Sequence, residues 1–239
     1  MEKIPDIIHE SWHKYLQPLF DDDKMKMIRD EILAHCYFYP APSNIFRVFS
    51  MPMEDIKVVI LGQDPYPNGE ANGLAFAVNE ETPIPKSLHI IFKEVIKAET
   101  PTEFVEELKT KDKTLQNWAN QGVFLLNTAL TVEEKNASSH LGIWKWFTRE
   151  IVKIISTHTN CIWLLWGSKA QEFKEYINGY SSYTQTGYLG DDNNYILEAP
   201  HPAAELYPGG KKKTTFSGCN HFILCNEILE LQNKQKINF

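Results

Sequence analysis

This chain contains one aspartate and one histidine that are well suited to catalyse bond cleavage, and each lies in a loop stiffened by prolines. Asp64 follows the apolar run 58–61, within the sequence Gly-Gln-Asp-Pro-Tyr-Pro of residues 62–67. His201 follows the predicted strand 195–199 and lies between Pro200 and Pro202. Proline fixes φ and removes a backbone donor, so such loops hold their side chains rigidly. Both residues are candidates for acid–base or electrostatic catalysis, with a turn aspartate and a structural histidine as the alternatives.

Two further polar residues follow apolar runs. Asn127 ends the run 122–127, and Ser168 comes after the run 161–166 and one glycine. An amide carries both a donor and an acceptor, so Asn127 could recognise the edge of a base; a turn amide satisfied within the chain is the alternative. Ser168 and Gln171 fit a helix capping box, to which a phosphate contact by Ser168 would be an addition.

These four residues are positioned by the pattern of the chain around them. Apolar runs alternate with amphipathic segments, which predicts an α/β fold with a four-stranded parallel sheet flanked by helices on both faces. The carboxyl ends of parallel strands lie at one edge of a sheet, where such folds bind ligands. We therefore expect Asp64, Asn127, Ser168 and His201 to share one crevice, with Tyr66 and Phe76 as its aromatic walls.

The helices are expected at 12–20, 25–36, 88–98, 101–108, 114–120, 144–156 and 218–231. Ser87 is the predicted N-cap of the third of these, and the same hydroxyl could also bind a phosphate. The absence of a Gly/Ser-rich linker or a repeat favours a single domain over residues 1–239, in which the helical segment 1–50 packs on the rest.

The composition is that of a globular protein, with 43% hydrophobic residues and a formal net charge of −7. Nucleic-acid binders usually have a basic face, so the overall charge argues against one. The distribution of charge matters more than its sum, however. Residues 201–221 contain three lysines, Lys211 to Lys213, against the single acid Glu205, which gives a local charge of +2.

The cysteines, at positions 36, 161, 219 and 225, are too few and too scattered for a disulfide framework. Cys219 and Cys225 with His221 would make an incomplete metal site. We see no secretion signal and no apolar run long enough to span a membrane. We expect a soluble, cytoplasmic monomer, and nuclear or viral origin stays open.

The sequence His-Glu-Ser-Trp-His at residues 9–13 matches the H-E-x-x-H pattern of zinc proteases. On a helix it would place His9 and His13 on one face to bind zinc, with Glu10 as the general base. Only eight residues precede the motif, and nothing near it could orient the imidazoles. A surface helix is the preferred interpretation.

Seven segments, in this order along the chain, resemble motifs of the family 1 uracil-DNA glycosylases. They are G-Q-D-P-Y, G-L-A-F-A-V, P-x-P-K-S-L, G-V-F-L-L-N-T-A-L-T-V, W-G-S-x-A-Q, A-P-H-P and F-S-G-C-N-H-F. The resemblance extends from about residue 11 through the last predicted helix. It implies an enzyme without metal or cofactor that hydrolyses the N-glycosidic bond of flipped-out deoxyuridine in single- or double-stranded DNA. The products would be free uracil and an abasic site, as in base excision repair.

The resemblance also implies roles for individual residues. An ionised Asp64 would stabilise the oxocarbenium-like sugar and orient the attacking water, and His201 would donate a hydrogen bond to uracil O2. Phe76 would stack on the base, and Asn127 would pair with its O4 and N3–H. Tyr66 would exclude the methyl group of thymine.

Further contacts are implied around this centre. Gln63 would contribute to substrate binding. DNA would be contacted by five residues, Pro85, Ser87, Ser168, Leu206 and Lys211. The implied partners are uracil-containing DNA and a DNA-mimicking inhibitor protein.

The chain departs from the family pattern in two places. Pro67 stands where the family usually has histidine. The usual H-P-S-P-L-S is replaced by residues 201–206, so Ala203 takes the place of a phosphate-binding serine and Glu205 that of the leucine inserted into the DNA stack. Leu206 or Tyr207 could serve as the inserted residue, and the lysine run could compensate for the lost phosphate contact.

Three other functions compete with this interpretation. A glycosylase for another damaged base is disfavoured by Tyr66 together with Asn127. A DNA-binding scaffold without activity is disfavoured by the presence of Asp64 and His201. A zinc protease would depend on the motif at residues 9–13.

Overall fold

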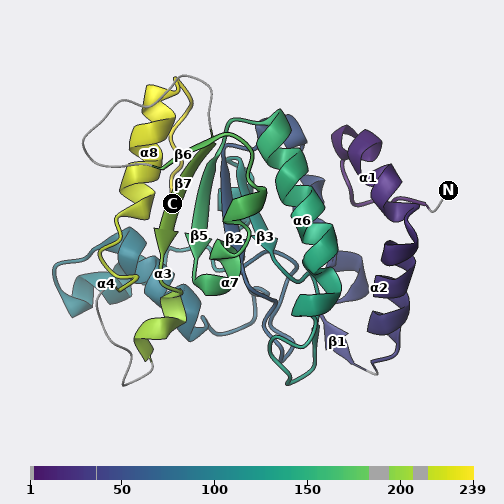
Figure 1. Cartoon of the computed structure of the whole chain (residues 1–239). Coiled ribbons are helices and arrows are strands. Elements are labelled where there is room, and N and C mark those ends of the chain that lie inside the picture. Colours follow the sequence, from purple (N-terminus) through teal and green to yellow (C-terminus); the bar gives the residue numbers. More distant parts are fainter. Residues whose placement is uncertain (1–2, 36, 183–193, 207–214) are drawn as a thin grey trace.

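The computed structural model describes residues 3–35, 37–182, 194–206 and 215–239. Its centre is a five-stranded parallel sheet in the order β3-β2-β5-β7-β6 (Figure 1). The strands are β2 (Val58–Gly62), β3 (Val123–Asn127), β5 (Ile162–Trp166), β6 (Tyr180–Ser182) and β7 (Asn194–Ala199). Four of them are the predicted strands. The fifth, β6, is a short edge strand whose sequence, Tyr-Ser-Ser, has no apolar run to reveal it.

The register of the sheet brings the strand ends level with one another. Gly62 at the end of β2 lies opposite Asn127 at the end of β3, and Trp166 of β5 lies opposite Ala199 of β7. Every residue of β2, β3 and β5 is buried, as expected for strands covered on both faces. The loops that follow these strands therefore leave the sheet side by side at its carboxyl edge.

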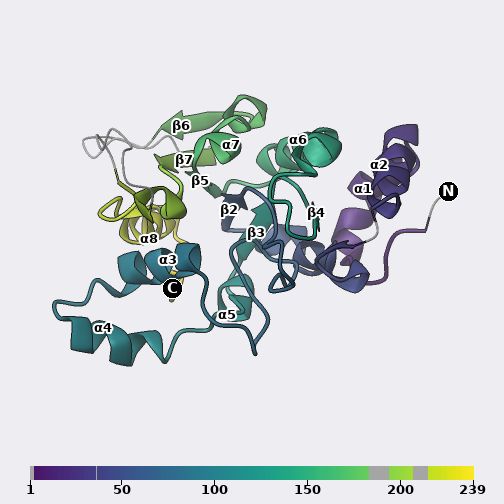
Figure 2. The ribbon, with the colours of Figure 1, turned by 90° about the horizontal axis from the view of Figure 1, so that it is seen from below.

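Helices cover both faces of the sheet (Figure 2). The helix α6 lies on one face, with α1 and α2 beyond it, and α3 and α8 lie on the other, with α4 outside them. The helices are α1 (His13–Phe20), α2 (Asp23–Leu33), α3 (Lys86–Ile96), α4 (Pro101–Leu108), α5 (Gln116–Ala119), α6 (Leu141–His158), α7 (Ser168–Gln171) and α8 (His221–Leu231). All the predicted helices are present, and most boundaries differ by a few residues. No helix among the described residues has the length and apolar character needed to cross a membrane.

The amino-terminal segment packs into the same core as the sheet. Trp12 is fully buried, stacks on Phe124 of β3 with ring centroids 5.4 Å apart, and donates from Nε1 to the carbonyl of Met51 at 2.7 Å. Burying a tryptophan with its N–H satisfied is among the larger single contributions a side chain makes to a core. The helical segment at the start of the chain is therefore attached to the sheet by a buried aromatic anchor.

The H-E-x-x-H sequence does not form the surface helix that we expected. Glu10–Trp12 is a single 3₁₀ turn, and α1 begins only at His13. One nitrogen of each imidazole is already engaged, since His9 Nδ1 lies 3.0 Å from the Ser11 hydroxyl and His13 Nε2 lies 3.2 Å from the Ile8 carbonyl. Within the described residues, no three His, Cys, Asp or Glu side chains are grouped to hold a metal ion.

A small antiparallel pair lies beside the sheet. It joins β1 (Phe38–Tyr39) to β4 (Val132–Glu133). The pair matters because β4 leads into the loop 133–139, which then turns toward the carboxyl edge before α6 begins.

Candidate active site

Phe76 connects the loops at the carboxyl edge of the sheet. Its ring centroid lies 5.8 Å from that of His201 and 5.4 Å from that of Trp166, and its carbonyl accepts a hydrogen bond from the Tyr66 hydroxyl at 3.3 Å. The residue itself has φ = 63°, a left-handed conformation that costs an L-amino acid about 1–3 kcal/mol. Such strain is found where the position of a side chain matters more than an unstrained backbone.

Asn127 faces the same place from the end of β3. Its side chain is only 5% exposed, yet Oδ1 has no hydrogen-bond partner among the described residues. A methyl group placed on Gly62 would lie 2.4 Å from this oxygen and 3.3 Å from the Phe76 ring, so glycine keeps open the space between them. A buried acceptor without a donor costs about 1–3 kcal/mol. The oxygen is therefore best explained as the acceptor for a ligand N–H next to the aromatic ring.

Asp64 is a half-buried carboxylate held by two donors. The backbone N–H of Ser138 donates to Oδ2 at 2.6 Å, and Gln63 Nε2 donates to Oδ1 at 3.0 Å. Burial raises the pKa of Asp64 above its ordinary value, and the two hydrogen bonds oppose that rise in the pKa. Both donors favour the ionised form, which is the form that can stabilise positive charge.

His201 is fixed as a neutral donor. The backbone N–H of Ala203 donates to Nδ1 at 3.1 Å, so Nδ1 must be the acceptor and the ring proton must reside on Nε2. Burial lowers the pKa of His201, which also favours the neutral ring. Gly167, at φ = 89°, packs so closely that an added Cβ would lie 2.8 Å from the Cβ of His201. The end of β5 thus supports a histidine that offers Nε2–H.

Tyr66 closes the site next to α3. Its hydroxyl shares a 2.7 Å hydrogen bond with the Ser87 hydroxyl, and burial raises the pKa of Tyr66 well above its usual range, so the phenol stays protonated. The prediction that Ser87 caps α3 is wrong. Pro85 is the N-cap, because its extended conformation starts the helix at Lys86, and Ser87 lies buried in the first turn.

The predicted capping box at Ser168 is also not formed. Gly167 is the N-cap of the four-residue helix α7, and no side chain caps it. Gln171 instead donates to the carbonyls of Leu165 and Ala199, at 3.4 and 3.0 Å, so it holds together the ends of β5 and β7. The hydroxyl of Ser168 is left exposed at the carboxyl edge.

The loop after His201 contains the residues considered for insertion into the DNA stack. The Glu205 carboxylate is turned toward Ser217, from which it accepts a backbone hydrogen bond at 2.5 Å and a hydroxyl hydrogen bond at 2.9 Å. Leu206, at the end of the 3₁₀ turn Pro202–Leu206, is 42% exposed. Tyr207 and the lysine run that includes Lys211 lie outside the described residues.

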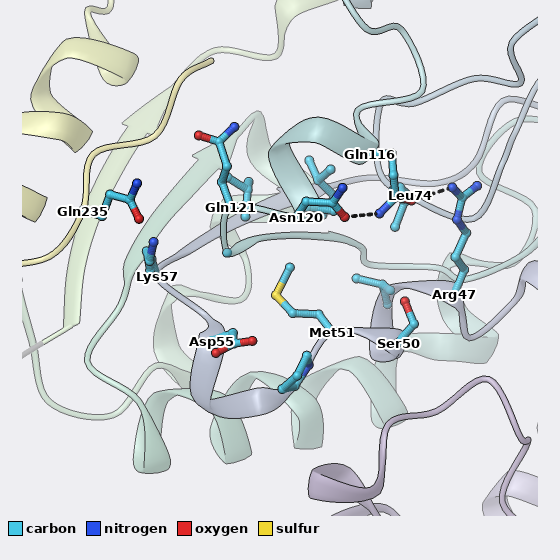
Figure 3. A pocket seen from close by; sticks show the side chains of 16 residues that line it. Arg47, Ser50, Met51, Asp55, Lys57, Leu74, Gln116, Asn120, Gln121 and Gln235 are labelled. Carbon is cyan, nitrogen blue, oxygen red and sulfur yellow. Dashed lines mark hydrogen bonds between the residues drawn. The ribbon is translucent and has the colours of Figure 1, made fainter.

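A cavity of about 550 Å³ lies at the opposite edge of the sheet, before β2 and β3 begin (Figure 3). Asp55, Lys57 and Gly122 line it, together with residues of α5. Figure 3 shows the Arg47 side chain directed to Gln116, which accepts its hydrogen bond at 2.7 Å. None of the predicted site residues lines this cavity, so the cavity is not part of the candidate active site.

Ser138 is the residue of this site that the sequence did not predict. The convergence of Asp64, Asn127, Ser168 and His201 on one edge was predicted from the order of strands and loops, with Tyr66 and Phe76 as aromatic walls. Ser138 instead reaches Asp64 from a polar run that resembles any surface turn, and its contact joins segments far apart in the sequence.

The sequence model of the uracil DNA glycosylase superfamily matches residues 49–229. The chain belongs to the uracil-DNA glycosylase superfamily. The resemblance that the seven motifs indicated is therefore confirmed, and the predicted α/β fold agrees with it.

Relatives in this superfamily match over nearly the full chain. A protein of Borrelia turicatae named uracil-DNA glycosylase is 40% identical, over 97% of this chain and 98% of its own length. One of Alcelaphine herpesvirus 1, with the same name, is 36% identical over 98% of this chain and 89% of its own. In fold, the chain is similar to a variant of mimivirus UNG in complex with UGI, with a TM-score of 0.79 at 24% identity, covering 99% of this chain and 90% of that one.

Proposed function

We propose that this protein is a uracil-DNA glycosylase that hydrolyses the N-glycosidic bond of deoxyuridine flipped out of DNA. Relatives that are 36–40% identical over almost the whole chain carry that name, which supports the activity. The single observation that carries the choice of substrate is Asn127 Oδ1, a buried acceptor with no partner among the described residues, beside the ring of Phe76.

Base recognition follows from the donors and acceptors of that amide. Oδ1 accepts from uracil N3–H, and Nδ2 donates to O4, while Phe76 stacks on the ring. Cytosine presents the reverse pattern at these two positions, which would leave buried groups unpaired on both sides. The ring of Tyr66 lies beside C5 and leaves no room for the methyl group of thymine.

Bond cleavage uses charges already in place. As the C1′–N1 bond breaks, its electron pair leaves with the base, and the Nε2–H of His201 stabilises the negative charge that gathers on O2. The ionised Asp64 stabilises the positive sugar and orients a water molecule. That water adds to C1′ and gives up a proton to the carboxylate, and the uracil anion is later protonated from solvent. His201 transfers no proton in this scheme, in keeping with its neutral ring.

DNA contacts extend from the same edge. Pro85, Ser87 and Ser168 lie at or near the starts of α3 and α7, where free backbone N–H groups can bind phosphates. Leu206 replaces Glu205 as the inserted residue, because it is a large apolar side chain that is exposed in that turn. A DNA-mimicking protein would compete for this surface, and complexes of fold relatives with UGI support such a partner.

The decisive experiment measures free uracil released from single-stranded and duplex DNA, in EDTA, by the wild type and by Asp64→Asn. We expect the wild type to release uracil from both substrates. The variant should be at least about 10²–10³-fold slower, the size of effect seen when one group that stabilises transition-state charge is lost.

Two outcomes would contradict the proposal. Release of hypoxanthine in preference to uracil by the wild type would indicate a glycosylase for another base. DNA binding without release of any base would indicate an inert scaffold.

A further inference from the structure

The loop 133–139 connects β4 to α6. It contacts both ends of the catalytic loop 63–67. The Lys135 N–H donates to the carbonyl of Pro67 at 2.8 Å. At the other end, the Ser138 N–H donates to Asp64 Oδ2 at 2.6 Å, and the Ser138 hydroxyl accepts from Gln63 Nε2 at 2.8 Å. The two loops are far apart in sequence, so these contacts exist only in the folded protein.

The side chain of Gln63 links the two contacts at the Ser138 end. Its amide nitrogen has two hydrogens, and one is donated to Asp64 Oδ1 at 3.0 Å while the other is donated to the hydroxyl of Ser138. The hydroxyl thus fixes which way the amide faces. With the amide so fixed, each oxygen of the Asp64 carboxylate has one donor.

The loop is braced independently of the site. The Ser139 hydroxyl accepts from the Glu133 N–H at 2.9 Å, and Asn136 Nδ2 donates to Glu133 Oε2 at 2.7 Å. Lys135 and Ser138 hold left-handed conformations, at φ = 59° and 70°. Non-glycine residues adopt this conformation only where the surrounding structure imposes it. The loop therefore presents Ser138 in one fixed orientation.

We propose that Ser138 is a positioning residue for the glycosylase reaction, because it orients the Asp64 carboxylate directly through its N–H and indirectly by holding the amide of Gln63. The inference rests on the proposed function. It extends that function to a loop that none of the seven motif roles includes, and it assigns the Gln63 side chain to the carboxylate rather than to the base.

The charged and titratable groups around Asp64 do not offer a simpler explanation. The 133–139 loop carries Glu133, Glu134 and Lys135, the catalytic loop carries Tyr66, and His201 follows the end of β7. Within the described residues none of these side chains bonds to Asp64. Burial and the two hydrogen bonds account for the direction of its pKa, with no contribution from a neighbouring charge.

This arrangement predicts the effect of pH. The reaction needs ionised Asp64, so activity is lost as the pH falls through the pKa of that carboxyl group. Burial raises this pKa and the two donors oppose the rise. Weakening the donors raises the pKa further, so the acid limb of the kcat/KM profile must move to higher pH.

The test is Ser138→Ala, which removes only the hydroxyl and keeps both the backbone N–H and the Cβ. Uracil release from single-stranded DNA is measured from about pH 4.5 to 9, a range that spans the titration of a carboxyl group with a raised pKa. We expect kcat/KM to fall about threefold at low pH, within the weight of one hydrogen bond, with the acid limb moved up by roughly half a pH unit. The loss should shrink toward alkaline pH, which a general loosening of the fold would not produce.

Ser139→Ala is the matched control, because it removes a hydroxyl from the same loop without touching Gln63 or Asp64. Asn136 still holds the loop at Glu133, so the acid limb should move clearly less than in Ser138→Ala. Adding Gln63→Ala to Ser138→Ala should cost no more than Gln63→Ala alone, since the hydroxyl acts through that amide. An unmoved acid limb in Ser138→Ala, an equal shift in Ser139→Ala, or additive effects of the pair would each overturn the assignment. A wild type without uracil release would refute the function instead.

Discussion

The two edges of the central sheet differ in how their polar groups are satisfied. At the amino edge, around the 550 Å³ cavity, the side chains of Arg47, Gln116 and Gln121 bond to other parts of the chain. Gln121, for example, donates to the carbonyls of Asn117 and Asn238 and accepts from the Asn238 N–H. At the carboxyl edge the amide of Asn127 is more deeply buried, yet its oxygen has no partner among the described residues.

Backbone conformation alone does not separate the two edges, because Leu115 at the start of α5 also has a left-handed φ, of 52°. At the carboxyl edge, the left-handed Phe76 borders the space that Gly62 keeps open beside Asn127, and Gly167 lets His201 pack closely against the end of β5. Open volume alone marks a place where water can enter. A buried acceptor without a partner that faces a space kept open by a glycine marks a place built for a ligand, because such an acceptor costs stability when the ligand is absent.

The largest effect is expected where a small change closes the catalytic edge. Gly62→Ala puts a methyl group 2.4 Å from Asn127 Oδ1 and 2.9 Å from the Cβ of Ala75, within the space assigned to the base. We expect kcat/KM for uracil release to fall by at least about 10²-fold, since displacements of about 1 Å have such effects in active sites. Steady-state kinetics on single-stranded DNA measures this without the cost of opening a duplex.

Gly142→Ala is the matched control. Gly142 lies in α6, an added Cβ there would meet no atom within 4 Å, and alanine is the better helix former. It should keep full activity and unfold at the same or a slightly higher temperature. Full activity in a folded Gly62→Ala would mean that no ligand occupies the gap, and the distinction between the edges would be lost.

A smaller effect is expected from enlarging the site. Tyr66→Ala removes the ring beside C5 together with the hydroxyl that bonds to Phe76 and Ser87. Thymine release should then become detectable, while uracil release falls about tenfold because the support of Phe76 is weakened. Chromatography of bases released from thymine- and uracil-containing strands measures both.

Tyr66→Phe separates the two roles of the side chain. It keeps the ring and loses the hydroxyl, so it should remain inactive on thymine while showing part of the loss on uracil. The assignment of Tyr66 to thymine exclusion is wrong if Tyr66→Ala also ignores thymine.

The sequence predicted those parts of the site that depend on strand order. The run 58–61 and its counterparts are too apolar to be anything but buried, and parallel strands bring the residues after them to one edge. Asp64, Asn127 and His201 were located in this way, and the resemblance to a glycosylase family gave Tyr66 and Phe76 their roles. Each lies at or soon after the end of a strand, or within a recognisable motif.

The contacts that the sequence could not predict are the ones made across the fold. Ser87 has the type of an N-cap, but Pro85 starts the helix and tertiary packing gives the hydroxyl to Tyr66. Gln171 likewise leaves its capping box for the carbonyls of two strands. The polar run 133–140 is typical of a turn, and only its approach to Asp64 shows that Ser138 matters. The local sequence indicates which hydrogen bonds a side chain can make, and the tertiary structure determines which of them forms.

The smallest effect is expected from deleting an amide at the amino edge. Gln121→Ala removes hydrogen bonds to Asn117 and Asn238 and leaves their polar groups to water, because this part of the side chain is exposed. We expect a loss of about 1 kcal/mol in the free energy of unfolding and a change in kcat/KM of less than about twofold.

Asn127→Ala makes the corresponding deletion at the carboxyl edge, where it removes an unpartnered acceptor. It should stabilise the free protein or leave its stability unchanged, while abolishing most of the activity. Urea unfolding should therefore show the larger loss of stability in Gln121→Ala, and uracil release should show the larger loss of activity in Asn127→Ala. If Gln121→Ala were the more damaging of the two in catalysis, the cavity would be coupled to the site, and buried acceptors could no longer be taken as the mark of function here.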